Sequence, residues 1–234
     1  MKPRISVLIP TLNEAKYLEA TLFHIKMQKP YEIIIGDSSS TDDTVKVAKK
    51  YGARVAVTKK RGSASYGRNA ATRIAKGDIF VFIDADTIPY TNFLDVIRKD
   101  FSDPKLVGWT CSFFAFSPKF RDQLMFQLAS DMIKVLTKYA RKPHAAGFAI
   151  AVRKDIFNRV RFDESLTAME DHDFTMRVGK YGKFKFSNET CVFSSVRRLN
   201  KWGRLGLVKK YASIYVKYFL KGGKLGKLRY ETVR

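Results

Sequence analysis

A regular alternation of apolar runs and helical patterns extends from the N-terminus to Ile83 and leaves few folds open to this chain. Each run is short, rich in branched residues and closed by polar or small residues, which is typical of a buried strand. Strands that alternate with helices through short connections form a parallel sheet with helices on both faces. The segment therefore predicts a Rossmann-like α/β half. Its expected strands are Ile5–Ile9, Tyr31–Ile35, Arg54–Thr58 and Ile79–Ile83.

The segments between these runs carry helix signals. Thr11 to Glu14 has the form of a capping box and predicts a helix that continues to about Gln28. A cap-rich stretch over 38–43 predicts a second helix ending near Gly52. A third helix is expected over Tyr66–Lys76, where Gly77 ends it.

Length and charge limit the possible functions. The chain has 234 residues, which fits one domain with an extension, and its 45% hydrophobic content is enough for a core. Lys and Arg number 44 against 22 for Asp and Glu, a formal net charge of +22. This excess indicates an anionic partner: nucleic acid, an anionic membrane face or a phosphorylated substrate.

Cysteine usage and the N-terminus favour a cytoplasmic protein. Cys111 and Cys191 are far apart and lack metal-binding spacing, so we expect free thiols in a reducing compartment. The N-terminal apolar stretch is too short for a signal peptide, and none is expected. No run approaches the ~18 apolar residues of a membrane span, so any membrane contact would be peripheral.

Polar residues gather where the predicted strands end. Asp37 closes the second strand, and Asp84 and Asp86 follow the fourth. In a parallel sheet these ends share one edge, where ligands bind. Paired carboxylates there suit Mg²⁺ or Mn²⁺ together with a diphosphate. Solvated loop acids ahead of a turn at Pro89 are the alternative. No GxGxxG follows the first strand and no P-loop motif occurs, which disfavours those two nucleotide sites.

Five motifs together resemble family 2 glycosyltransferases of the GT-A fold. Their order and spacing match the family over roughly residues 4–200. The resemblance implies transfer of a sugar from a nucleotide diphosphate sugar, with inversion at the anomeric carbon and usually with Mg²⁺ or Mn²⁺. The motifs are IPTLNE (9–14), GDSSSTDDT (36–44), GRNAA (67–71), GDIFVFIDAD (77–86) and MEDHDFTMR (169–177).

The same resemblance implies a domain organisation. Residues 1–200 would form the GT-A domain, a mostly parallel sheet flanked by helices. Within it, 1–106 would bind the nucleotide sugar and 107–200 the acceptor. Residues 201–234 would form a basic amphipathic extension.

For the nucleoside, the resemblance assigns four residues. Pro10, Thr11 and Glu14 would line its pocket. Asp37 would accept a hydrogen bond from a uracil or guanine imino group, which leaves UDP and GDP both open. A loop acid beside a helix is the alternative for Asp37.

For the phosphates, sugar and metal, the resemblance assigns three more. Arg68 would lie near the donor's phosphates or sugar, the alternative being an exposed helical arginine. Asp84 would contact ribose or sugar hydroxyls and is a second candidate metal ligand. Asp86 would hold the metal.

The acidic cluster at residues 170–173 matches the family's E-D-x-D/E motif. Inverting transfer needs a general base opposite the departing diphosphate, and the resemblance assigns that role to Asp171. Glu170 would lie on the acceptor side, and Arg197 or Arg198 would clamp phosphate. Acids that complement a helix N-terminus are the alternative. The Q-x-x-R-W motif of processive enzymes is absent, which favours single transfer.

The acceptor is left open by the central and C-terminal segments. Phe120–Tyr139 predicts an amphipathic helix that packs on the core or lines a lipid-chain groove.

After Arg197 the chain is strongly basic and Glu231 is its single acid. This tail predicts a helix that binds an anionic membrane or packs on the domain. Leu205, Val208, Ala212, Tyr215 and Phe219 recur in it at helical spacing. A lipid-embedded acceptor, such as a polyprenyl phosphate or a glycolipid, would suit the first alternative.

Two other functions are compatible with parts of the sequence. A nucleotidyltransferase of related fold would carry a Gly-rich basic loop after the first strand, where this chain has Thr11 to Glu14. A non-catalytic protein that binds nucleic acid or membrane is favoured by net charge alone. No nucleic-acid-binding motif occurs, so nucleic acid is not expected as a partner.

Overall fold

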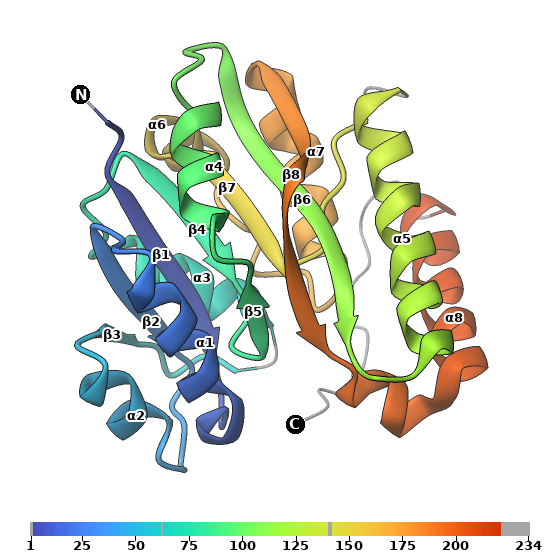
Figure 1. The fold of residues 1–234 in the computed structure, drawn as a ribbon, viewed down its shortest axis with the longest axis horizontal. Coiled ribbons are helices and arrows are strands. Elements are labelled where there is room, and N and C mark those ends of the chain that lie inside the picture. Colours follow the sequence, from blue (N-terminus) through green and yellow to red (C-terminus); the bar gives the residue numbers. More distant parts are fainter. Residues whose placement is uncertain (1, 62, 140–141, 221–234) are drawn as a thin grey trace.

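A computed structural model describes residues 2–61, 63–139 and 142–220. Its centre is one mixed sheet of eight strands in the order β3-β2-β1-β4-β7-β6-β8-β5 (Figure 1). The strands are β1 (Ile5–Thr11), β2 (Glu32–Asp37), β3 (Arg54–Val57), β4 (Ile79–Ile83), β5 (Thr87–Pro89), β6 (Leu106–Phe116), β7 (Ala149–Arg153) and β8 (Lys183–Ser195).

The N-terminal half of the sheet is the parallel unit that the alternating pattern predicts. β1 pairs with β2 on one side and β4 on the other, and β2 pairs with β3, all in parallel. The α/β prediction is confirmed. Because these strands run the same way, Thr11, Asp37 and the residues after Ile83 meet at one edge.

The C-terminal half of the sheet mixes parallel and antiparallel pairs. β7 pairs antiparallel with both β4 and β6. The four strands predicted from the sequence do not include β5, β6, β7 or β8. β6 and β8 run parallel to each other, and β8 also pairs antiparallel with β5. Cys111 on β6 and Cys191 on β8 are free thiols, as expected.

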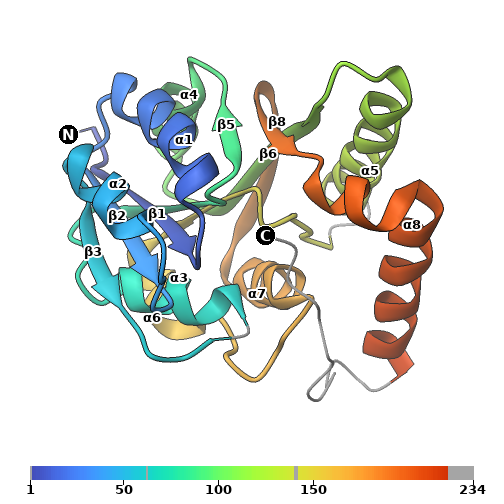
Figure 2. The same ribbon diagram turned by 90° about the horizontal axis from the view of Figure 1, so that it is seen from below.

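Helices cover both faces of the sheet (Figure 2). Alternate residues of β1 point to opposite faces of the sheet: Val7 and Ile9 pack in the core on one face, and Leu8 packs in the core on the other. On the first side lie α1 (Ala15–Met27), α2 (Thr44–Lys50), α4 (Phe93–Asp100) and α5 (Phe120–Lys138). On the second lie α3 (Ala64–Thr72), α6 (Lys154–Val160) and α7 (Glu170–Val178), which a short 3₁₀ turn, Gly179–Tyr181, follows.

The last described helix is α8 (Arg197–Leu220), kinked at Gly203. Ile214 and Tyr218 on α8 pack against the segment 166–169 that leads into α7. The stripe predicted from the tail lies on another face: Leu205, Val208 and Ala212 are exposed and Tyr215 is partly buried, while the side chain of Phe219 lies outside the description. Residues 221–234 of the predicted extension also lie outside the described residues. None of the described helices has the length and hydropathy needed to span a membrane.

The expected capping box at Thr11 is wrong. Thr11 ends β1, and its hydroxyl donates to the carboxylate of Asp37 on the neighbouring strand. Helix α1 starts only at Ala15, and its N-cap residue, Glu14, makes no side-chain capping hydrogen bond. The hydroxyl is used across the sheet because the parallel register sets Thr11 beside Asp37.

The prediction that α5 packs on the core holds for only part of its residues. Phe126 and Ile133 are buried in the larger core cluster. Leu124, Leu128, Met132 and Val135 are exposed instead, because one face of a helix is enough to cover β6 and β8.

Helix α3 approaches β2 very closely at a pair of glycines. A Cβ atom on Gly36 would collide with the backbone carbonyl of Gly67, and one on Gly67 would lie 2.5 Å from the carbonyl oxygen of Gly36. This contact sets the height of α3 above the sheet, and therefore the position of Arg68, the next residue.

We expect Gly36→Ala to lower the free energy of unfolding by about 1–3 kcal/mol, because backbone must move to admit the methyl group. Urea unfolding followed by circular dichroism measures this. Gly206→Ala on α8 is the control: its Cβ would meet only Trp202 at 3.6 Å. The control should be neutral or stabilising. Equal unfolding midpoints for Gly36→Ala and wild type would contradict the close-approach argument.

Candidate active site

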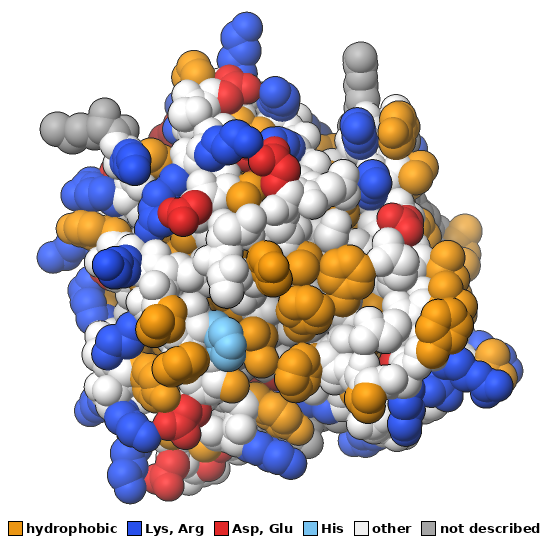
Figure 3. Space-filling view, in the orientation of Figure 1, with side chains coloured by type: hydrophobic (Ala, Val, Ile, Leu, Met, Phe, Trp, Pro, Cys, Tyr) orange, Lys and Arg blue, Asp and Glu red, His pale blue; other side chains and the backbone are white. Residues whose placement is uncertain are grey.

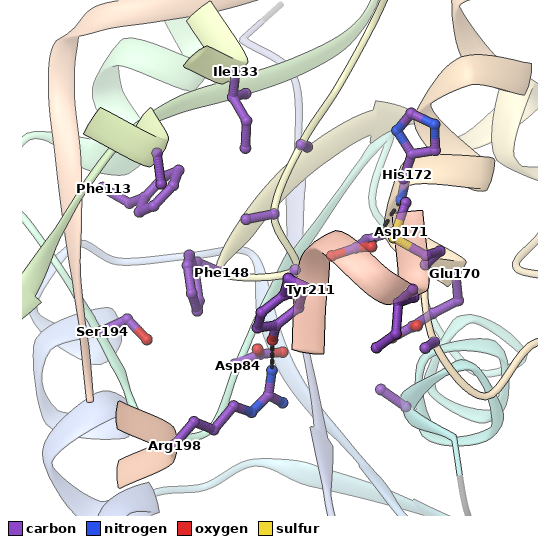
Figure 4. A pocket seen from close by; sticks show the side chains of 18 of the residues that line it. Asp84, Phe113, Ile133, Phe148, Glu170, Asp171, His172, Ser194, Arg198 and Tyr211 are labelled. Carbon is purple, nitrogen blue, oxygen red and sulfur yellow. Dashed lines mark hydrogen bonds between the residues drawn. The ribbon is translucent and has the colours of Figure 1, made fainter. Parts of the chain in front are cut away.

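A cavity of about 850 Å³ opens at the carboxyl ends of β1 and β4 and extends between α5, α7 and α8 (Figure 4). Every residue proposed for the site from sequence lines it except Asp37, whose neighbour Ser38 does. The cavity therefore joins the predicted donor side to the predicted acceptor side. The predicted residues in its lining are Pro10, Thr11, Glu14, Arg68, Asp84, Asp86, Glu170, Asp171, Arg197 and Arg198.

Asp37 is buried behind the cavity wall. Its carboxylate accepts hydrogen bonds from the Thr11 hydroxyl and from the backbone N–H and hydroxyl of Ser40. In this arrangement it holds the loop after β2 against the end of β1. Contact with a base would use the remaining lone pairs of the carboxylate.

Arg68 connects the two halves of the site. Its side chain is 2% exposed and forms ion pairs with Asp84 at 3.1 Å and Glu170 at 3.3 Å. Burial alone would lower the pKa of Arg68, but the charges of Asp84, Glu170 and Asp171 more than offset it and the pKa is raised. The alternative of an exposed helical arginine is excluded. The guanidinium also lies over the ring of Phe162, 5.1 Å from its centroid.

Asp86 is held by a second arginine. Nε of Arg197 lies 2.9 Å from Oδ2 of Asp86, and the two terminal nitrogens donate to both carboxylate oxygens of Glu14. The Asp86 side chain is 8% exposed, so it is not a solvated loop acid. Burial is the main reason that the pKa of Asp86 is raised to about 6. The positive charge of Arg197 acts to lower this pKa, and the negative charges of Asp84 and Glu14 act to raise it.

The acidic cluster starts helix α7. Met169, just before it, adopts left-handed φ of 64°, and such backbone in a non-glycine residue often marks a functional site. Glu170 forms its ion pair with Arg68. The pKa of Glu170 is raised, first because the carboxyl is buried and second because the charge of Asp171 repels it. Asp171 lines the cavity and accepts a hydrogen bond from the backbone N–H of His172.

His172 packs in an aromatic cluster. Its ring centroid lies 4.1 Å from that of His144, 5.7 Å from that of Tyr215 and 5.4 Å from that of Tyr218. Burial and then His144 lower the pKa of His172 to about 4. The ring is therefore neutral near pH 7, and its contacts with the two tyrosines tie α7 to α8.

Residues that sequence reasoning did not assign complete the cavity. Arg198 donates a hydrogen bond to the Tyr211 hydroxyl at 2.9 Å (Figure 4). Tyr211 and Tyr215 lie one turn apart on α8. The stripe predicted from the tail contains Tyr215, and the same helical periodicity is the signal that could have found Tyr211. Much of the remaining lining is apolar and comes mainly from α5, β6 and α8: Phe113, Met125, Phe126, Met132, Ile133, Leu136, Phe148, Leu207, Val208 and Ile214.

The donor side fits a hard divalent cation that shares its coordination with phosphate. Asp84 and Asp86 lie one residue apart at the end of β4, and Mg²⁺ is commonly bound by one or two carboxylates plus substrate phosphates. The described residues include no cluster of three or more His, Cys, Asp or Glu side chains suited to a metal ion. The remaining ligands would therefore come from the substrate.

Comparison with known proteins identifies the class of this fold and site. A solved mannosyltransferase from Pyrobaculum calidifontis, in complex with GDP-Man and Mn²⁺, superposes with a TM-score of 0.74 at 24% identity, covering 97% of this chain and 66% of that one. The fold is the GT-A glycosyltransferase fold, as predicted. A sequence model described as glycosyl transferase family 2 matches residues 6–161. The chain belongs to this family, and the predicted family is confirmed.

Two curated relatives show how far the similarity extends. The poly(ribitol-phosphate) β-N-acetylglucosaminyltransferase TarS of Staphylococcus aureus is 26% identical over 196 residues, which are 75% of this chain and 32% of the relative. A Methanococcus voltae enzyme is 34% identical over 122 residues, 44% of this chain and 37% of the relative. It is named dolichyl N-acetyl-α-D-glucosaminyl phosphate 3-β-D-2,3-diacetamido-2,3-dideoxy-β-D-glucuronosyltransferase. The chain thus matches about a third of the length of these relatives.

The buried histidine makes stability depend on pH. The folded pKa of His172, about 4, lies below its ordinary value of 6.5, so the unfolded chain binds the proton more readily. The contribution of His172 to the free energy of unfolding is fully present above pH 6.5. It is lost as pH falls toward 4, by up to about 3 kcal/mol.

We therefore expect His172→Phe to flatten the decline in unfolding free energy between pH 6.5 and 4.5, measured by urea titration. His24→Phe, on α1, should keep the decline of the wild type. An unchanged slope in His172→Phe would show that the histidine is not buried as described.

Proposed function

We propose that this protein is a metal-dependent inverting glycosyltransferase. It would move a sugar from a UDP- or GDP-sugar to an acceptor hydroxyl or phosphate. The observation that carries the proposal is one cavity in which Asp84 and Asp86 share the space with Asp171, and in which Asp84 is linked to α7 through buried Arg68. Inverting transfer requires a leaving-group site and a base within reach of one sugar carbon.

On the donor side, Pro10, Thr11 and Glu14 would border the nucleoside, and Asp84 and Asp86 would hold Mg²⁺ or Mn²⁺. When bound, the metal would supply positive charge to the leaving diphosphate. Arg197 is already paired with Asp86, so this carboxylate would lie between the guanidinium and the metal. Arg197 and Arg198 would contact phosphate oxygens.

On the acceptor side, Asp171 would take the proton from the attacking group. It lines the cavity, while its neighbour Glu170 is committed to Arg68. This division supports Asp171 rather than Glu170 as the base. Tyr215 lies close enough that burial and Asp171 raise its pKa to about 12, so it stays a neutral hydroxyl at the acceptor end.

We further propose a lipid-linked acceptor, such as a polyprenyl phosphate or a glycolipid, used at the cytoplasmic face of a membrane. The apolar lining between α5 and α8 supports it, since a soluble sugar needs no such surface. A dolichyl-linked substrate in the name of the Methanococcus voltae relative is consistent with it.

The donor proposal is tested by thermal shift with UDP, GDP, CDP, dTDP and ADP, each with and without Mn²⁺. One nucleotide at 100 times its Kd should stabilise the fold by about 2.7 kcal/mol, roughly 5–10 °C in Tm, and only with metal. Asp86→Asn should abolish the shift. Asp95→Asn, an exposed carboxylate on α4, is the control and should keep it. No shift with any nucleotide would refute the donor site.

The base is tested separately with Asp171→Asn. We expect kcat for transfer to fall about 10²–10⁴-fold while the metal-dependent nucleotide shift persists, because the carboxylate acts on the acceptor. Radiolabelled sugar transfer to lipid extract and calorimetry of donor binding provide the two readouts. Retained transfer at the wild-type rate would assign the base elsewhere.

A further inference from the structure

Helix α5 exposes an apolar stripe along its whole length. Its members follow one another at intervals of three or four residues, so they share one face of the helix. Each is between 45% and 75% exposed, although the opposite face of the same helix is in the core. A contiguous apolar face of this size on a described surface marks a contact site. The stripe consists of Phe120, Leu124, Leu128, Met132, Val135 and Tyr139.

Helix α8 continues this surface. An ion pair of 2.6 Å between Asp122 and Arg204 joins the two helices near the start of α5. Figures 1 and 2 show α5 and α8 together at one end of the molecule, and Figure 3 shows orange side chains over α5 along its edge with blue ones beside them. The exposed large apolar residues of α8 are Leu205, Val208, Val216 and Leu220.

The exposed charge around the stripe is predominantly positive. The exposed bases of α8 are Lys201, Arg204, Lys209 and Lys217, and the sequence of this helix has no acid. Lys119, Arg121 and Lys138 are exposed on or beside α5. The two acids of α5 are withdrawn from the surface, since Asp122 is buried against Arg204 and Asp131 is partly buried. An apolar face bordered by cations matches the interface of a bilayer that carries anionic lipid.

The apolar surface is continuous with the cavity. Met132 on α5 and Val208 on α8 are both more than half exposed, and both also line the cavity that contains Asp171. The cavity therefore opens between the two helices, at the stripe.

We propose that the exposed faces of α5 and α8 form a docking surface for an anionic lipid bilayer. Docking there sets the cavity mouth at the lipid surface, where the apolar part of an acceptor can enter; this second point rests on the proposed function. A second copy of the chain fits the surface less well. Self-association would bring cation-rich helices together without exposed acids to pair with them.

The proposal is tested by cosedimentation of the full chain with two kinds of vesicle, phosphatidylcholine alone and an equal mixture of phosphatidylcholine and phosphatidylglycerol. Wild type should bind the anionic vesicles at least tenfold more strongly, and added salt should weaken binding. Leu128→Glu/Val135→Glu should reduce binding at least tenfold, because two carboxylates would enter the apolar contact. The matched control is Met27→Glu/Val57→Glu, two residues 68% and 61% exposed on other elements, which should bind like wild type.

Three outcomes would overturn the proposal. One is that the two double variants bind anionic vesicles equally well. Another is that the wild type binds anionic vesicles no more strongly than phosphatidylcholine vesicles. The third is a dimer of the wild type in sedimentation velocity that Leu128→Glu/Val135→Glu dissociates, without vesicle binding, which would make the stripe an interface between copies.

The metal-dependent nucleotide shift of each variant is measured in parallel. It shows that the variants are folded and separates the two proposals. Vesicle binding without any nucleotide shift would leave the docking surface standing and reject the donor site. A nucleotide shift without vesicle binding would support the donor site and reject the docking surface.

Discussion

The site depends on a guanidinium that is almost completely removed from water. Arg68 is buried between Asp84, which follows β4, and Glu170, which starts α7. A buried charge is tolerated only when its partners are present, and removing one partner typically costs about 3–5 kcal/mol. The interaction therefore couples the N-terminal parallel unit to the start of α7.

A second arginine, partly buried, repeats this arrangement with a different consequence. Arg197 neutralises Glu14 and Asp86 and also packs on the ring of Tyr17, 5.2 Å from its centroid. Because Arg197 starts α8, the charge balance at the end of β4 is linked to the position of that helix.

The cavity changes character along its length. At the strand ends it is lined by carboxylates and arginines, and between α5 and α8 it is lined by apolar side chains. The same two helices expose apolar residues outward. A molecule with a polar head and an apolar tail matches this gradient, because each end would meet the environment that solvates it.

The parallel unit follows from local sequence, since branched apolar runs at short intervals can be buried on both faces only in such a sheet. The candidate residues at the strand ends follow as well, because those positions are fixed by where each run stops. Long-range packing sets what these residues contact. Glu14 and Arg197 are 183 positions apart, and β6 pairs with β8 although α5, β7, α6 and α7 come between them in the chain, which no local pattern encodes. Packing also sets which apolar positions of α5 face the core and which face outward. A periodic pattern marks a face of a helix, but only the packed neighbours determine whether that face is covered.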